Sequence, residues 1–165
     1  MFNVEVLGDV LFTYDAMGTL FGFPSCCCNG TDFQQLYLLD SRLAAYVFSV
    51  LSGGWIRHYG RMEVWRCDDD PCFHGDFGYK MKEIGIFVDF IPGDQTAHFL
   101  LGKGERRGWS AKLLLERTID STQAVGRDQM EQVGIQMCYA LVSHVSQRGA
   151  TPAMSVFGQL PRVPG

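Results

Sequence analysis

Three carboxylates in this chain occur where an acidic side chain needs a compensating charge. Asp9 lies inside an apolar, strand-like run, Asp68 directly follows a second such run, and Glu105 opens a helix-like segment. A carboxylate in an apolar strand is costly to bury without a partner. Three carboxylates brought together would repel one another by roughly 4 kcal/mol per close pair at an intermediate dielectric. A divalent cation between them would offset this repulsion, and hard oxygen ligands suit Mg²⁺ or Mn²⁺.

The hydrophobic pattern predicts a mixed sheet that would carry these side chains. Turns at 15–18 and 29–32 join the first three predicted strands into an antiparallel meander. Helices and strands then alternate, which favours a sheet covered by helices on both faces. The predicted strands cover 4–14, 19–28, 33–39, 63–67 and 86–91.

The helical pattern is interrupted at glycines. We expect a helix near 42–59 with Ser41 as its N-cap and a weakening or kink at 52–54, where two glycines follow a serine. A mobile loop is expected over 93–102. The other predicted helices cover 77–84, 103 or 105 to 118, and 127–145.

Composition indicates one folded domain, taken as residues 1–165, without a membrane span. The chain has 165 residues, of which 47% are hydrophobic, and it holds no apolar run long enough to cross a bilayer. Its six cysteines include the consecutive Cys26–Cys28 and show no zinc-ligand spacing. We therefore expect reduced thiols in an intracellular protein, which carries no targeting signal in this sequence.

The distribution of charge matters more than its sum. A net charge of −4 argues against indiscriminate binding to nucleic acid. The segment 103–117 is nevertheless locally basic, with five cations against Glu105 and Glu116. A solvated helix face would have the same composition, so the segment alone leaves both interpretations open.

Several motifs follow one another along the chain. They are Phe2–Asp9, Trp55–Gly60 followed by Val64–Asp68, Phe87–Gly93, Gly102–Arg106, and the terminal stretch 149–165. Their ordered succession resembles the catalytic core of retroviral-type integrases, especially those of retrotransposons. The resemblance spans almost the whole chain and implies a ribonuclease H-like α/β fold with a mixed five-stranded sheet and helices on both faces.

The resemblance implies metal-dependent phosphodiester cleavage and DNA strand transfer with two Mg²⁺ or Mn²⁺ ions. Asp9 would bridge both ions, and Asp68 and Glu105 would each hold one. The family also uses basic residues beside the glutamate to bind DNA, and the matching candidates are Lys103, Arg106 and Lys112.

The same resemblance also predicts the oligomeric state, the cellular location and the absence of two flanking domains from this segment. It implies a homodimer or higher multimer through the helices near 42–59 and 127–145, and a nuclear location in a eukaryotic host. The family's N-terminal zinc domain and C-terminal DNA-binding barrel are not expected within 1–165.

The second aspartate has an alternative. The distance from Phe73 favours Asp68, whereas the commonest family spacing to Glu105 favours Asp69. Successive strand side chains point to opposite faces, so the two cannot both face the site while strand pairing lasts. We choose Asp68 and take Asp70 as a turn residue before Pro71.

One tryptophan and two histidines also have competing interpretations. Trp109 could stack on a base, but we expect a half-buried core tryptophan. We expect a surface or loop role for His74, and His98 falls in the predicted mobile loop, where it could touch DNA.

Two other functions fit the same residues. The second strand ends in Ser25–Cys28, where relatives usually carry an aliphatic segment ending in aspartate. One alternative is therefore a catalytically silent integrase remnant that binds DNA or protein. The other is a cellular ribonuclease H-like nuclease acting on RNA or RNA–DNA hybrids. The proline-containing motifs of the terminal stretch 149–165 argue against this second alternative.

Overall fold

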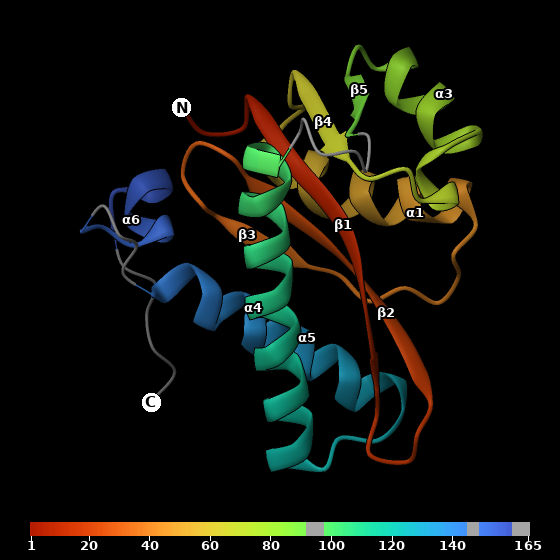
Figure 1. The fold of residues 1–165 in the computed structure, drawn as a ribbon, viewed down its shortest axis with the longest axis vertical. Coiled ribbons are helices and arrows are strands. Elements are labelled where there is room, and N and C mark those ends of the chain that lie inside the picture. Colours follow the sequence, from red (N-terminus) through yellow and green to blue (C-terminus); the bar gives the residue numbers. More distant parts are fainter. Residues whose placement is uncertain (92–97, 145–148, 160–165) are drawn as a thin grey trace.

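The computed structural model describes residues 1–91, 98–144 and 149–159, with the side chains of 98–105 left out of the description. Its centre is a five-stranded sheet with strand order β3-β2-β1-β4-β5. The sheet is mixed (Figure 1) because β1 pairs antiparallel with β2 and parallel with β4. The strands are β1 (Glu5–Tyr14), β2 (Leu20–Cys28), β3 (Gln34–Leu36), β4 (Val64–Cys67) and β5 (Phe87–Phe90).

Helices cover both faces of this sheet, as Figure 1 shows, with α4 in front of β1 and α1 behind the sheet. The helices are α1 (Ala44–Leu51), α2 (Arg57–Tyr59), α3 (Asp76–Glu83), α4 (His98–Thr122), α5 (Gly126–Ser143) and α6 (Pro152–Phe157). A π-helical turn, η1 (Ser52–Ile56), joins α1 to α2, and a short 3₁₀ helix, η2 (Pro71–Phe73), follows β4. The predicted mixed sheet between helical layers is confirmed.

Strand β1 contributes to two separate cores because its side chains alternate between faces. Val6 and Val10 belong to one core, which contains Trp65 and side chains of α1 and α3. Leu11 belongs to the other, which contains Leu115 of α4 and side chains of α5. Strand β1 thus separates the two cores. Its odd-numbered side chains are on the face that α4 covers.

The predicted boundaries of α4 were wrong at both ends. The helix begins at His98, so residues 98–102 of the predicted mobile loop are helical, while 92–97 lie outside the described residues. Gly102 and Gly104 suggested a later start because each glycine costs roughly 1 kcal/mol in a helix, but the helix tolerates both. The helix continues past Thr118 to Thr122 and is followed by Gln123 with a positive φ of 52°.

Other local predictions also need correction. The N-cap of α1 is Leu43, and the Ser41 hydroxyl accepts a hydrogen bond from the Leu43 N–H at 3.2 Å instead of capping the helix. Residues 52–54 widen the helix into η1 without breaking it. Helix α6 was not predicted; its N-cap is Thr151, whose hydroxyl accepts from the Met154 N–H at 3.1 Å.

The six cysteines all lie within the described residues, and no disulfide joins any of them. Five are buried, and the half-buried Cys138 thiol accepts a hydrogen bond from the Leu36 N–H at 3.0 Å and donates to the Leu36 carbonyl at 3.4 Å. Burial raises the pKa of the Cys138 thiol to about 11. Within the described part of the chain, no helix has the length and apolar character needed to cross a membrane.

Candidate active site at the ends of two parallel strands

Asp9 lies on the face of β1 that α4 covers. Its side chain is half-buried, and its Oδ1 accepts a hydrogen bond from the Val10 N–H at 2.7 Å. Its Oδ2 is 3.0 Å from the position that a Cβ on Gly108 would occupy, and Leu11 lies 3.5 Å from the same position. Asp9 and Leu11 therefore point together toward α4, and the helix meets the carboxylate at a glycine.

Helix α4 is fixed against the sheet on both sides of this contact. Arg107 forms an ion pair with Asp32, in the turn between β2 and β3, at 2.6 Å. Farther along the helix, Ala111 and Leu115 pack in the core with Leu11. Glu105 lies three residues before Gly108, which is about one helical turn. The backbone of Glu105 is therefore about one turn from the point where α4 meets Asp9, while its side chain lies outside the description.

Asp68 directly follows β4, at the point where the parallel pairing of β4 with the middle of β1 ends. The parallel register pairs Gly8 with Cys67, so the next positions along are Asp9 and Asp68. Side chains at paired positions of neighbouring strands leave the same face of a sheet, and this favours Asp68 as a partner of Asp9. Asp68 is exposed, and its pKa is raised, mainly by partial desolvation and further by the negative charge of Asp70.

The two aspartates after Asp68 have other contacts. Asp70 caps η2 by accepting from the Cys72 N–H at 2.9 Å, and it pairs with Arg42 at 2.9 Å. Its predicted place at the turn before Pro71 is confirmed. Asp69 contacts His74, with 2.8 Å between Oδ1 and Nε2. The choice of Asp68 over Asp69 stays a prediction that the strand register favours.

His74 is a surface residue, as expected. Its ring is exposed and stacks on Phe90 with centroids 4.3 Å apart and planes 4° from parallel. Together with the Asp69 contact, this stacking connects the segment after β4 to β5. The side chain of His98 lies outside the description, so its predicted contact with DNA stays a prediction.

An ion-pair network between the strands was missed from the sequence. Arg66 Nη1 lies 2.7 Å from Glu5 Oε1, and Arg66 Nε lies 2.8 Å from Asp89 Oδ2. These three residues belong to β1, β4 and β5, and the Arg66 side chain is only 18% exposed. Arg66 is two residues before Asp68, so the network fixes the strand that leads into the site. The sequence did hold one indication of a role for Arg66: strand alternation places its side chain on the same face as that of Asp68.

The predicted DNA-binding side chains lie on α4. Arg106 is exposed, and Lys112 is also exposed, with its Nζ 4.0 Å from Glu116. Lys103 is in the helix, but its side chain lies outside the description. Trp109 is 67% exposed, so the expectation of a half-buried core tryptophan was wrong.

The described carboxylates suit a hard cation better than zinc. Asp9 and Asp68 offer oxygen donors, whereas the nearby Cys67 thiol is buried in the core on the opposite face. Among the residues whose side chains are described, no three His, Cys, Asp or Glu gather into a metal-binding group. The Glu105 side chain is not among them. If all three carboxylates converge, their donor chemistry fits Mg²⁺ or Mn²⁺.

No protein-family model matches the sequence, and no curated protein matches it. Solved structures do resemble it. The HTLV-2 integrase catalytic core domain in complex with magnesium, in its trimeric form, superposes with a TM-score of 0.74 at 14% identity. That match covers 92% of this chain and 95% of the HTLV-2 chain.

Two further structures are similar. The BIV integrase catalytic core domain has a TM-score of 0.68 at 14% identity, with 94% and 95% of the two chains covered. A simian T-cell lymphotropic virus intasome in complex with PP2A regulatory subunit B56 gamma gives a TM-score of 0.76 at 16% identity. The match covers all of this chain but 58% of that one.

These likenesses establish the fold. The chain has the ribonuclease H-like architecture of retroviral integrase catalytic cores, as the sequence motifs predicted. At this level of identity they establish the fold alone, so the reaction is inferred from the residues of the site.

Proposed function

We propose that this chain is the catalytic core of a retroelement integrase that cleaves phosphodiester bonds and transfers DNA strands. The observation that carries the proposal is the meeting of β1, β4 and α4: Asp9 contacts α4 at Gly108, and the register leads to Asp68. Glu105 lies about one turn before that contact. The presence of magnesium in the similar HTLV-2 core supports a divalent cation here.

Asp9, Asp68 and Glu105 would hold two Mg²⁺ or Mn²⁺ ions. Such ions, when bound, lower the pKa of an attacking water or hydroxyl and stabilise the leaving oxygen of an in-line displacement. Asp9 is suited to its role because β1 is a central strand and the Val10 N–H orients one of its oxygens. Lys103, Arg106 and Lys112 would bind backbone phosphates, which positions DNA without reading its sequence.

The direct test is cleavage and strand transfer on DNA oligonucleotides with Mn²⁺ or Mg²⁺. Asp9→Asn, Asp68→Asn and Glu105→Gln should each abolish both reactions, while Asp120→Asn, at an exposed position late in α4, should not. Activity that survives Asp68→Asn but not Asp69→Asn would move the second ligand to Asp69. Activity that survives Asp9→Asn or Glu105→Gln would refute the mechanism.

Metal binding gives a readout that is independent of turnover. Titration calorimetry with Mn²⁺ should show binding by the parent chain and its loss in Asp9→Asn. Salt-sensitive DNA binding without metal binding or cleavage would instead favour the silent remnant.

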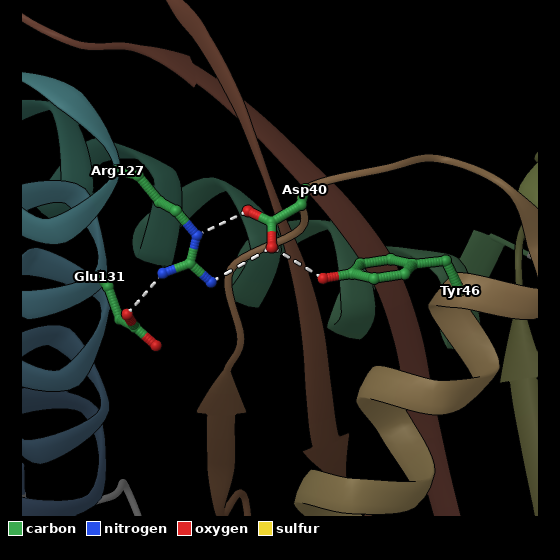
Figure 2. A network of polar contacts seen from close by, with 4 residues as sticks. All are labelled: Asp40, Tyr46, Arg127 and Glu131. Atoms are coloured by element: carbon green, nitrogen blue, oxygen red, sulfur yellow. Dashed lines mark hydrogen bonds and ion pairs between the residues drawn. The ribbon is translucent and has the colours of Figure 1, made fainter.

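We also propose a homodimer or higher multimer that forms through α1 and α5. Figure 2 shows how these helices are connected: Arg127 of α5 pairs with Asp40 at 2.7 Å and with Glu131 at 2.9 Å. Asp40 in turn accepts from the Tyr46 hydroxyl of α1 at 2.8 Å. On α5, Ile135 is 57% exposed, which suits an apolar contact.

The multimer is supported by the dimeric and trimeric forms in which the HTLV-2 core is known. Light scattering over a concentration series should detect a species larger than the monomer, and Ile135→Glu should shift it to monomer. A parent chain that stays monomeric at high concentration would contradict the proposal.

A further inference from the structure

The three tryptophans of the chain have very different environments. Trp55 and Trp65 are buried, with 0% and 1% of their surface exposed, and both pack in the core with α1 and α3. Trp109 is 67% exposed on α4. Tryptophan has a large apolar surface whose burial normally stabilises the folded chain, so a ring left in solvent is available for a ligand.

Trp109 lies on the helix face that Glu105 and Lys112 share. It follows Glu105 by four residues and precedes Lys112 by three, and residues at these separations are neighbours on a helix surface. The buried stripe of α4 consists of Gly108, Ala111, Leu115 and Ile119. Trp109 falls outside this stripe, so the ring stands beside the candidate active site and next to exposed cations.

We propose that Trp109 is a stacking platform for an unpaired nucleobase of the DNA strand bound at this site. The assignment of DNA as the ligand rests on the proposed function. An indole ring can stack only on a base whose face is free, and inside a duplex each face is covered by the neighbouring base pair. Lysine and arginine contacts to phosphate make no such distinction. The ring therefore selects a strand with an unpaired nucleotide close to the scissile phosphate.

Intrinsic fluorescence isolates this residue, because the other two tryptophans are buried. In metal-free buffer, a short single-stranded thymine oligonucleotide should quench the exposed component of the emission. A blunt two-strand duplex with the same number of nucleotides, in which every base is paired, should quench it much less. Trp109→Phe should remove the quenched component and leave the emission of the buried tryptophans.

Affinity for a labelled single strand, measured by anisotropy, gives the size of the contribution. Trp109→Ala should weaken binding roughly 5- to 100-fold, and Trp109→Phe should recover most of the loss. Tyr79→Ala is the matched control, because Tyr79 is 65% exposed but lies on α3. The ratio of the dissociation constants of Trp109→Ala and the parent should be the same at low and high salt. Lys112→Ala should instead reduce the slope of log affinity against log salt concentration by about 1.

Two results would overturn the inference: equal quenching by the single strand and the fully paired blunt duplex, or an affinity of Trp109→Ala within about two-fold of the parent. These measurements need no metal, so they stand apart from catalysis. If Trp109 still stacks on the single strand but the chain never cleaves DNA, the proposed function is refuted and the stacking inference stands. Cleavage retained without stacking would remove this inference alone.

Discussion

The carboxylate of Asp9 on β1 occupies the space beside Gly108 of α4 that a side chain at position 108 would need. A Cβ at position 108 would lie 3.0 Å from Asp9 Oδ2, which is tighter than an ordinary van der Waals contact. The helix can approach the strand this closely because residue 108 has no side chain. The position of Glu105, about one turn earlier, depends on the same approach.

Gly108→Ala should therefore separate stability from function. Alanine is favoured over glycine in a helix by about 1 kcal/mol, so the fold should remain intact. The added methyl group should displace Asp9 and lower Mn²⁺ affinity and strand transfer roughly tenfold or more. Urea unfolding and single-turnover strand transfer measure the two effects. Gly53→Ala, where a Cβ would meet nothing within 4 Å, is the control. Full activity in Gly108→Ala would show that the contact is unimportant.

Gly8→Ala should destabilise the fold itself. A Cβ at this position would overlap the Trp65 ring, whose surface is only 1% exposed in the core. Overpacking of this kind costs about 1–3 kcal/mol, and sometimes more. The free energy of unfolding, measured with urea, should fall by that amount. Gly78→Ala in α3, with its nearest contact at 3.7 Å, should leave it unchanged or raise it. An unchanged midpoint in Gly8→Ala would contradict the packing described here.

Arg66→Ala should weaken the sheet beneath the site. Without the guanidinium, the carboxylates of Glu5 and Asp89 would face each other without a cation from β4. Because the network is partly buried, we expect a loss of about 2 kcal/mol, between the values for surface and buried ion pairs. Lys112→Ala, which breaks an exposed pair with Glu116, should cost less than about 1 kcal/mol. Equal losses in the two variants would show that the strand network adds nothing beyond a surface pair.

Asp15 should contribute to stability in a way that depends on pH. The N–H groups of Gly126 and then Thr19 hold its pKa below the ordinary value of 3.8. A lowered pKa means that the contribution is complete above pH 3.8 and is lost as pH falls through the folded value.

Asp15→Asn should therefore lower the melting temperature near pH 7, and the difference from the parent should shrink below about pH 4. Thermal unfolding followed from neutral to acidic pH measures it. Asp120→Asn, on the exposed surface of α4, serves as the control. A difference that stays constant at every pH would exclude the carboxylate charge as the cause.

The sequence was sufficient to predict the features that depend on local periodicity. The alternating pattern around Asp9 predicted β1 and the meander, and helical spacing predicted α5 near its observed bounds. Asp68 was recognised because it follows a strand directly. The register that leads from the Gly8–Cys67 pair to Asp9 and Asp68 comes from the parallel pairing of β1 and β4, which the sequence alone does not reveal.

The errors arose where tertiary packing decides the outcome. Trp109 was expected in the core because tryptophan is usually buried, but the buried stripe along the described side chains of α4 consists of Gly108, Ala111, Leu115 and Ile119. Local alternation places Arg66 on the face of Asp68, but its partners Glu5 and Asp89 lie on two other strands, so only the strand pairing of the fold brings the network together. The early start of α4 was missed because Gly102 and Gly104 lower helix propensity, which is a weak guide when a long helix docks on a sheet.

Because β1 faces a different core on each side, mutations in the segment that encodes it should have two very different effects. Val6 and Val10 support one core, while Asp9 faces the other way and lies among residues that support the second. On the proposed function, a point mutation at position 9 would end catalysis and leave both hydrophobic cores intact. Inserting a single residue would instead turn the strand side chains that follow it to the opposite face. Copies that have lost catalysis should therefore persist as folded, soluble proteins, and frameshifts or small insertions in this strand should leave none.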